Sequence, residues 1–244
     1  MLRKLQDQIL NPETTAYPDY ADFIGAYCLF CQYKTIVELG VYLGETTLRL
    51  CHAAKANGGK VYGYDRFEAE GQQLNWNDPT FGKSGIENKM MRSGINPTIF
   101  KITKIDTSTD EFVKILNEDT KGIIDFAFID ADHSYKGIKN DFLKVYPYLT
   151  EEGSIMFHDT FNHVGCRKFI LDLYQDFNDG TYDIINLPFG FGNSRCGLTI
   201  LTKRSYPLNQ TNLAPPCPEY DTEPITREEV YEAEKEWYNK QLKK

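Results

Sequence analysis

The sequence lacks any apolar run long enough to cross a membrane. A spanning helix needs about 20 consecutive, mainly apolar residues, and no such run occurs among the 244 residues. The N-terminus reads Met-Leu-Arg-Lys-Leu-Gln-Asp and does not contain the apolar stretch of a secretory signal. We therefore expect a cytoplasmic protein with no membrane partner.

Clusters of basic residues are also lacking. The chain has 27 Lys and Arg against 35 Asp and Glu, which gives a formal net charge of −8. Proteins that bind a phosphate backbone gather Lys and Arg on one surface. The composition therefore argues against a nucleic-acid partner.

Cysteine pairs with the spacing of a zinc site are nearly absent. Six cysteines in a chain without an export signal are expected to be free thiols. Cys28 and Cys31 form a C-x-x-C pair within an apolar run, and no second C-x-x-C supplies the other ligands of a structural zinc site. We interpret this pair as core packing.

What the sequence does contain is a regular alternation of β-rich runs and helical stretches. Residues 35–39, 45–57 and 60–65 read as a strand, a helix and a strand, and such a unit has parallel strands. Further strands are predicted at 98–105, 123–130, 153–158, 182–187 and 197–202, and further helices at 20–33, 110–117, 134–149 and 164–178. The last two strands are joined by a short Gly-rich connection, which favours an antiparallel pair.

Two regions interrupt this alternation. Residues 66–97 form a long segment between the second and third strands, with a helix expected near 83–92, and such insertions are often lids or substrate loops. From residue 205 a Pro-rich stretch leads to a charged helix over 226–243. We expect one domain over 1–204 and a tail over 205–244 that is a solvated appendage or a contact in a homo-oligomer.

The loop after the first strand indicates a nucleoside cofactor. It reads Glu38-Leu39-Gly40-x-x-x-Gly44, at the place where parallel α/β sheets bind ligands. A dinucleotide fingerprint needs a middle glycine so that the backbone can approach the pyrophosphate, and Tyr42 occupies that position. S-adenosylmethionine carries no phosphate, so the loop favours it over NAD.

Acidic residues follow the second and third strands. Asp65 lies 21 residues after Gly44, where a carboxylate can accept hydrogen bonds from both ribose hydroxyls. Residues 106–108, Asp-Thr-Ser, are placed to contact an adenine edge. The two segments extend the predicted adenosine site along the rim of the sheet.

Polar residues concentrate after the fourth and fifth strands. The two loops read Asp-Ala-Asp-His-Ser-Tyr at 130–135 and His-Asp-Thr-Phe-Asn-His at 158–163, and they contain three of the four histidines. A hydroxyl that accepts a methyl group must lose its proton. His133 or His158 could take it, or Mg²⁺ held by Asp130 and Asp159 could acidify the hydroxyl. The residues leave this choice open.

Together these motifs resemble class I S-adenosylmethionine-dependent methyltransferases, most closely the branch of macrocin O-methyltransferase-like and cephalosporin-hydroxylase-like enzymes. The resemblance covers about residues 30–203. It rests on V-E-L-G-x-x-x-G at 37–44, F-I-D-A-D-H-S-Y at 128–135 and G-S-I-M-F-H-D-T at 153–160. It implies a Rossmann-like α/β fold with a doubly wound, mostly parallel seven-stranded sheet, an antiparallel last strand and helices on both faces.

The resemblance also implies an activity and a set of site residues. The expected reaction is methyl transfer from S-adenosylmethionine to a hydroxyl of a small molecule, with a sugar or glycosylated natural product as the acceptor. The catalytic set is expected to be His133, Asp130 and His158. Metal-dependent relatives hold Mg²⁺ with acids at the positions of Asp130 and Asp159, although here the neighbours of Asp159 are His158 and Thr160. The cofactor pocket is expected to comprise Glu38, Gly40, Tyr42, Gly44, Thr46, Asp65, Arg66, Asp106, Thr107, Ser108, Asp130 and His133.

Two other functions are compatible with this fold class. An NAD-dependent oxidoreductase is disfavoured by Tyr42 and by the lack of a suitably placed Y-x-x-x-K pair. A hydroxylase-like relative, or a binding protein that kept the cofactor pocket without transfer chemistry, is the other alternative. The combination of Asp130, His133 and Asp159 argues for catalysis.

Overall fold

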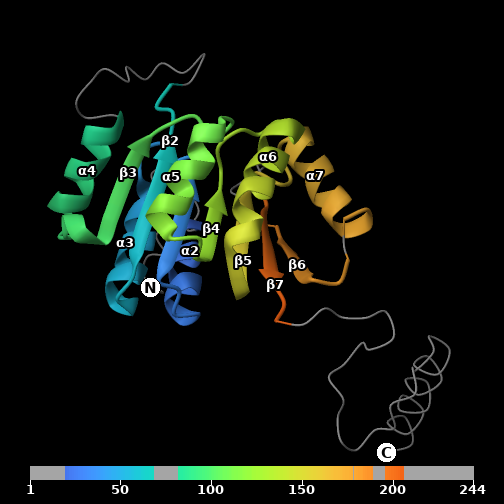
Figure 1. Cartoon of the computed structure of the whole chain (residues 1–244), viewed down its shortest axis with the longest axis horizontal. Coiled ribbons are helices and arrows are strands. Elements are labelled where there is room, and N and C mark those ends of the chain that lie inside the picture. The colour runs from blue at the N-terminus through green and yellow to red at the C-terminus, as the bar shows by residue number, and fades with distance from the viewer. Residues whose placement is uncertain (1–19, 69–81, 178, 189–195, 206–244) are drawn as a thin grey trace, which may run out of the picture. The chain divides into compact units, whose positions relative to one another are not determined.

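The computed structural model describes residues 20–68, 82–177, 179–188 and 196–205 (Figure 1). The strands form one seven-stranded sheet in the order β3-β2-β1-β4-β5-β7-β6. Their bounds are β1 Thr35–Leu39, β2 Lys60–Asp65, β3 Phe100–Lys104, β4 Ile124–Ile129, β5 Leu149–His158, β6 Tyr182–Leu187 and β7 Leu198–Lys203. Strand β7 is antiparallel to both of its neighbours, and the other adjacent strands are parallel. The predicted Rossmann-like sheet is confirmed.

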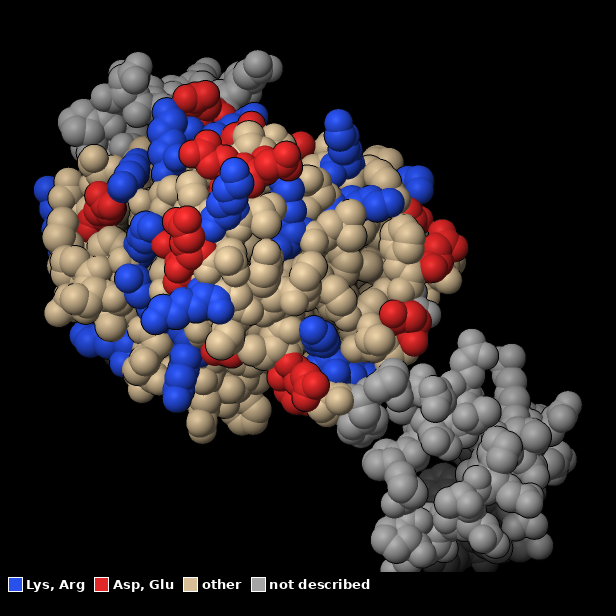
Figure 2. All heavy atoms as spheres, in the orientation of Figure 1, with Lys and Arg blue, Asp and Glu red and all other residues tan. Residues whose placement is uncertain are grey.

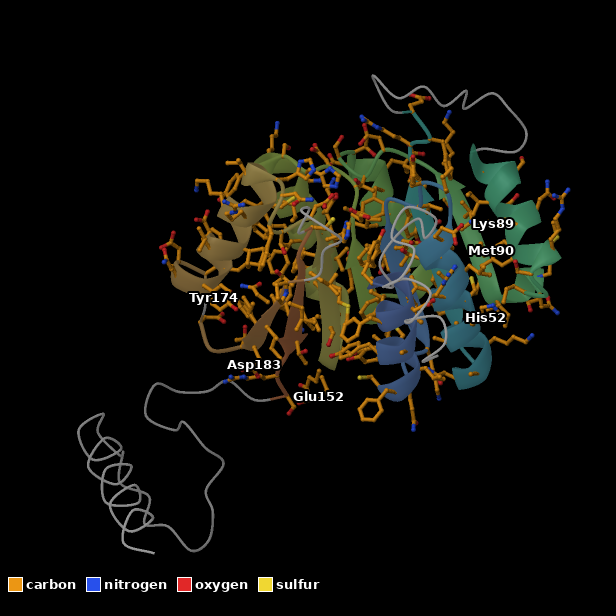
Figure 3. The ribbon with its side chains drawn as sticks, turned by 180° about the vertical axis from the view of Figure 1, so that it is seen from behind. His52, Lys89, Met90, Glu152, Tyr174 and Asp183 are labelled. Atoms are coloured by element: carbon orange, nitrogen blue, oxygen red, sulfur yellow. The ribbon has the colours of Figure 1, made fainter. Side chains whose placement is uncertain are left out.

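Helices cover both faces of the sheet, as expected. One face carries α2 (Tyr20–Phe30), α3 (Glu45–Asn57) and α4 (Gly82–Arg92), and the other carries α5 (Asp110–Thr120), α6 (Tyr135–Val145) and α7 (Val164–Gln175). The second group lies in front of the sheet in Figure 1, and the first is seen from behind in Figure 3. Each group encloses its own cluster of buried apolar side chains.

Strand β4 shows why its sequence is almost continuously apolar. Phe126 and Phe128 belong to the core beneath α2 and α3, whereas Ala127 and Ile129 belong to the core beneath α5, α6 and α7. Side chains alternate between the faces of a strand, so a central strand covered on both sides needs apolar residues throughout. The strand ends at the polar loop that begins with Asp130.

Helix α6 carries one acid within its buried stripe. Ile138, Phe142 and Val145 have the i, i+4, i+7 spacing of an amphipathic helix, and all three pack in the core of that face. Asp141 lies on the same stripe and is only 1% exposed. A carboxylate in an apolar stripe is costly to bury, which singles this residue out.

Gly40 joins the loop after β1 to the loop after β4. Its φ is +88°, and a Cβ atom at this position would lie 2.1 Å from the backbone oxygen of Asp130. Only glycine permits so close a backbone approach. At the far end of α3, Gly58 adopts φ +68° and its N–H bonds the Ala54 carbonyl, as expected for a glycine C-cap.

Three boundaries, at two places in the chain, differ from the prediction next to a proline. Strand β3 begins at Phe100, since a 3₁₀ turn over Pro97–Ile99 precedes it. Helix α6 ends at Val145, and a second 3₁₀ turn over Tyr146–Tyr148 leads into β5 four residues earlier than expected. Proline lacks the N–H needed to continue an α-helix and favours such turns.

The remaining regional expectations are met only in part. Helix α4 confirms the helix predicted near 83–92. Residues 69–81 of the insertion, residues 189–195 of the Gly-rich connection and the tail from 206 lie outside the described residues, so the domain division and the lid stay predictions. None of the described helices combines the length and apolarity that crossing a bilayer would require.

Candidate functional site

The carboxyl ends of the parallel strands surround a cavity of about 760 Å³. The cavity lies at the boundary between β1 and β4. The strands before this point, β1 to β3, follow one another toward one edge of the sheet, and the chain then returns to β4 on the other side of β1. This reversal of strand order is the topological switch point of the sheet. Open α/β sheets bind ligands at such a point. The volume is in the range of about 300–1,000 Å³ typical of small-molecule sites.

Most residues of the expected site line this cavity. From the expected cofactor set the wall includes Gly40, Tyr42, Asp65, Arg66, Asp106, Thr107, Ser108, Asp130 and His133. The expected catalytic residue His158 and the expected metal ligand Asp159 are also part of the wall. Residues from five different strand ends therefore meet as the sheet topology predicted.

Three expected cofactor residues lie outside the wall. Glu38 is 1% exposed, and its Oε2 accepts a hydrogen bond of 2.5 Å from the Thr47 hydroxyl, because its side chain faces α3 rather than the cavity. Burial holds the pKa of Glu38 well above its ordinary value. Gly44 faces Ile86 of α4, and Thr46, in the first turn of α3, is buried and shares a hydrogen bond with Tyr20.

Asp65 holds the glycine loop in place. Its Oδ2 accepts hydrogen bonds from the backbone N–H groups of Val41 (2.8 Å) and Tyr42 (2.9 Å), and its Oδ1 accepts one from Phe67 (2.6 Å). A carboxylate offers about four acceptor directions, so three are already used. Asp65 lines the cavity and shapes the loop, and its expected contact with a ribose stays a prediction.

Asp130 joins two histidines at the floor of the site. Its Oδ1 lies 3.2 Å from His133 Nε2 and 3.2 Å from His158 Nδ1. Burial alone would raise the pKa of Asp130, but the charges and hydrogen bonds of His158 and His133 outweigh it and hold this pKa below its ordinary value. The hydrogen bond with Asp130 in turn raises the pKa of His133.

Asp159 completes this network from the loop after β5. Its Oδ2 lies 3.3 Å from His133 Nε2 and 3.6 Å from His158 Nδ1. Burial would lower the pKa of His158, but Asp130 and Asp159 outweigh it, and the pKa is raised. Two carboxylates thus face the same two imidazoles and favour their protonated forms.

One ring nitrogen of His158, Nδ1, has a hydrogen-bond partner, and the other, Nε2, has none among the described residues. Its ring stacks on Tyr20 from α2, with centroids 4.3 Å apart. Its Nε2 is buried and has no hydrogen-bond partner among the described residues. In the neutral imidazole whose Nδ1–H donates a hydrogen bond to Asp130, Nε2 carries the lone pair that a general base needs. Tyr20 was not foreseen, because nothing in its local sequence marks it.

The donor groups do not fit the expected Mg²⁺ site. Two sets of potential ligand atoms lie within 4.8 Å of one another among the described residues, His133 with Asp159 and His163, and His158 with Asp159 and Cys196. Neither set includes Asp130, and both are rich in nitrogen or sulfur, whereas Mg²⁺ prefers oxygen ligands. The rings of His133 and His163 are stacked, with centroids 4.3 Å apart and an interplanar angle of 23°.

Helix α6 contributes a wall that the sequence analysis missed. Gly137, Asn140 and Asp141 line the cavity next to the segment 106–108. Asn140 Nδ2 donates to the Thr107 carbonyl (3.3 Å), and Lys144 Nζ donates to the same carbonyl (2.7 Å). The signal that was available is the acid at position 141 within an otherwise apolar stripe.

Comparison with known proteins points to one family. A family model described as a methyltransferase domain matches residues 37–160, the part of the chain that contains β1 to β5 and most of the cavity wall. A search of curated proteins finds no match.

Several solved structures share the fold. The O-methyltransferase TomG from Streptomyces achromogenes, involved in tomaymycin synthesis and solved in complex with SAM, is 12% identical with a TM-score of 0.61, covering 82% of this chain and 86% of that one. An O-methyltransferase from Bacillus cereus in complex with SAH is 14% identical with a TM-score of 0.59, covering 83% and 89%. An rRNA methylase from Streptococcus thermophilus is 13% identical with a TM-score of 0.55, covering 79% and 99%. At such identities these likenesses establish the fold alone.

Proposed function

We propose that this chain, which belongs to the methyltransferase domain family, is an S-adenosylmethionine-dependent O-methyltransferase that acts on a hydroxyl group of a small molecule. The observation that carries this proposal is the pairing of His158 with Asp130 at the floor of the cavity, with the second imidazole nitrogen left without a partner. This pairing supplies a proton acceptor beside the space where a cofactor and an acceptor can meet.

The cavity wall supports S-adenosylmethionine as the cofactor. Gly40, Tyr42 and Asp65 line one side, and residues 106–108 line another. A bound pyrophosphate requires glycine at the position that Tyr42 occupies. The loop therefore disfavours NAD. The TomG structure is a complex with SAM and the Bacillus cereus structure is a complex with SAH, and the present chain shares their fold.

The chain's own residues perform the proton chemistry. When bound, S-adenosylmethionine would supply the methyl group for transfer to the acceptor oxygen. His158 takes the hydroxyl proton at Nε2, and Asp130 stabilises the resulting imidazolium through Nδ1–H. His133, which lies between Asp130 and Asp159, is a positioning residue that contacts both carboxylates and helps to keep the pKa of Asp130 below its ordinary value. General-base catalysis of this kind contributes about 10²- to 10⁴-fold.

A sugar or glycosylated natural product is the preferred acceptor class. This choice follows the resemblance to the macrocin-type branch and the polar character of the wall formed by Asp130, Asp132 and Asp159. RNA is the less favoured acceptor. On the face shown in Figure 2, Lys and Arg are interspersed with Asp and Glu instead of forming one basic surface.

The proposal is tested by separating cofactor binding from methyl transfer. Purified protein is titrated with S-adenosylhomocysteine, and methyl transfer from S-adenosylmethionine is then measured over a panel of hydroxylated acceptors. The expected result is binding of S-adenosylhomocysteine and transfer to a hydroxyl, with transfer lost and binding retained in His158→Ala. Transfer to nitrogen or carbon acceptors alone would overturn the O-methyltransferase assignment.

A further inference from the structure

The segment that leads into β7 brings a thiol to the residues at the end of β5. A ring nitrogen of His158, a carboxylate oxygen of Asp159 and the Sγ of Cys196 all lie within 4.8 Å of one another. The proposed proton transfer uses His158 and gives Cys196 no role. Local sequence gave no sign of this proximity, because it depends on the antiparallel pairing of β5 with β7, in which His158 lies opposite Leu198.

Backbone contacts within the protein fix the position of Cys196. The Phe161 N–H donates a hydrogen bond of 2.9 Å to the Cys196 carbonyl. The next residue, Gly197, has φ +77°, and a Cβ atom there would lie 2.6 Å from the Phe161 ring. Glycine therefore lets the two segments approach this closely, and the thiol is held beside the loop after β5.

Asp159 adopts a backbone conformation that few side chains tolerate. Its φ is +56°, in the left-handed region, and such residues are concentrated at ligand-binding and catalytic sites. Only 14% of its side chain is exposed. The surrounding structure thus holds this carboxylate toward the imidazoles at a cost in backbone strain.

His158 can bind an ion through either ring nitrogen. Nδ1 lies 3.6 Å from Asp159 Oδ2, which matches the separation of about 3.3–3.8 Å that tetrahedral zinc, with bonds of about 2.0–2.3 Å, sets between its ligand atoms. Nε2 is buried without a hydrogen-bond partner in the described part of the chain. An ion at Nε2 would leave Nδ1 on Asp130, as in the carboxylate–histidine pairs that orient metal-binding imidazoles.

The three donors select a different class of ion from Mg²⁺. A thiolate, an imidazole and one carboxylate suit borderline ions such as Zn²⁺ and Co²⁺, whereas Mg²⁺ prefers oxygen ligands. Three protein ligands with a fourth position for water is a common zinc arrangement. His158 and Asp159 also line the cavity, which gives an ion a path of entry.

We propose that His158, Asp159 and Cys196 bind a thiophilic divalent cation such as Zn²⁺, and that the bound ion turns off methyl transfer. The thiol releases its proton to water when the ion binds. An ion on Nε2 occupies the lone pair that takes the hydroxyl proton, and an ion on Nδ1 leaves the ring proton on Nε2, with the same result. The binding site stands independently of the proposed function, whereas the inhibition rests on it.

Co²⁺ is the probe for the site, because a cobalt–thiolate bond gives a charge-transfer absorption band in the near ultraviolet. The full chain, reduced and freed of metal, is titrated with Co²⁺, and Zn²⁺ is then added. We expect saturable binding, a thiolate band that rises with occupancy, and loss of the band when Zn²⁺ displaces Co²⁺. Absence of binding, or binding without the thiolate band, would overturn the inference.

Matched variants locate the ion. Cys196→Ser should abolish the band and weaken Co²⁺ binding by at least about tenfold, since loss of even an indirect partner of a metal site costs this much. Cys31→Ser is the control, because Cys31 is a part-exposed thiol in the C-x-x-C pair, and it should keep both. A band that persists in a folded Cys196→Ser protein, or that disappears in Cys31→Ser, contradicts the assignment.

A second variant covers the case in which Cys196→Ser does not fold. Asp159→Asn keeps the size of the side chain, and asparagine tolerates a positive φ. We expect its Co²⁺ affinity to fall by at least about tenfold. Unchanged affinity in Asp159→Asn would remove Asp159 from the site and overturn the inference.

Methyl transfer tests the inhibition separately. Rates with Zn²⁺ are compared with the metal-free rate of the same protein, and saturating Zn²⁺ should lower the rate of the unmodified chain by about 10²-fold or more. Cys196→Ser should need at least about tenfold more Zn²⁺ for the same effect. If Co²⁺ binds through Cys196 but no methyl group is transferred under any condition, the site stands and the proposed function falls. Full activity with Zn²⁺ bound would overturn the inhibitory role.

Discussion

At the scale of single residues, the proposed role of His158 follows from the contacts of its imidazole ring. Asp130 contacts its Nδ1, Tyr20 stacks on its ring, and its Nε2 is buried without a hydrogen-bond partner among the described residues. His133 contacts two carboxylates through its Nε2 and is more exposed, with 34% of its side chain accessible. The two histidines therefore differ in role although both were candidates for the base.

Replacing His158 should separate chemistry from binding. We expect His158→Ala to lower kcat by about 10²- to 10⁴-fold, because the acceptor hydroxyl loses its proton acceptor, and to leave S-adenosylhomocysteine affinity nearly unchanged. His52→Ala is the control, since His52 is exposed on α3 (Figure 3). Single-turnover rates and calorimetric titration of both variants measure the two effects. A normal rate in His158→Ala would move the base to His133.

Asp141 should reduce the stability of the ligand-free protein. Its pKa in the folded protein is raised from 3.8 to about 6, so ionisation favours the unfolded chain as the pH rises from about 4 to 6. We expect Asp141→Asn to be more stable by about 1–3 kcal/mol at pH 7 and no more stable below pH 4. Lys144 attracts the carboxylate and Asp132 repels it, and neither charge changes in this variant. Denaturant unfolding at both pH values decides, and a less stable Asp141→Asn at pH 7 would mean that the carboxylate is already satisfied.

At the scale of elements, the loop after β1 depends on its neighbours. Asp65 binds two of its backbone N–H groups, and Lys89 of α4 donates to the Leu43 carbonyl at 2.8 Å. Lys89 and Met90 are marked on α4 in Figure 3, and Met90 approaches Gly44. The loop is thus held by β2 on one side and by α4 on the other.

Removing the Asp65 carboxylate should therefore affect both loop and ligand. Asp65→Ala leaves the N–H groups of Val41 and Tyr42 without their acceptor, so we expect S-adenosylhomocysteine affinity to fall by at least about tenfold. The strands around the site should remain intact, because Asp65 ends β2 and does not pack in the core. Titration together with circular dichroism tests this. Unchanged affinity in Asp65→Ala would refute both the ribose contact and the loop-holding role.

The sequence predicted some elements better than others for physical reasons. Strands β1 and β2 and helix α3 match their predicted bounds, because glycine marks their ends and the β-rich runs are short. The start of β3 and the end of α6 differ from their predicted positions. Short 3₁₀ turns that contain Pro97 and Pro147 occupy residues that were predicted as strand and helix. Long-range pairing of β5 with β4, not local propensity, extends β5 back to Leu149.

The same limits apply to the candidate site. Residues that follow strands, such as Asp130 and His158, could be placed from the alternation alone, because parallel strands end at one rim. The sequence did not show that Glu38 bonds Thr47 instead of lining the cavity, because the face to which a side chain points depends on the packing of α3. Asp141 was missed because a residue within a helix reaches the cavity only through the docking of α6 on the sheet.

At the scale of the whole molecule, the sheet order puts the site between its two halves. Strands β3, β2 and β1 supply the glycine loop, Asp65 and residues 106–108, and β4 and β5 supply the His–Asp network. The two parts of the site are therefore separate in sequence and adjacent in space. This arrangement explains why the motifs at 37–44 and 128–160 predict a shared site when they are considered together, whereas either motif alone is weak evidence for one.

The donor chemistry of the assembled site also makes a prediction about metal. Because the sets that include Asp159 are rich in nitrogen or sulfur and omit Asp130, we expect chelation by EDTA to leave the rate of methyl transfer unchanged and added Mg²⁺ not to raise it. Initial rates with EDTA, with Mg²⁺ and with neither provide the comparison. Loss of activity in EDTA that Mg²⁺ restores would reinstate Asp130 and Asp159 as metal ligands.

The central claim, that the cavity is an S-adenosylmethionine site, is tested most directly by calorimetric titration of the full chain with S-adenosylhomocysteine and, in parallel, with NAD. We predict saturable binding of S-adenosylhomocysteine in the micromolar range and no saturation by NAD, because Tyr42 crowds the position of a pyrophosphate. Binding of NAD in preference to S-adenosylhomocysteine, or binding of neither, would contradict the assignment of the loop over Gly40–Gly44 and the function built on it.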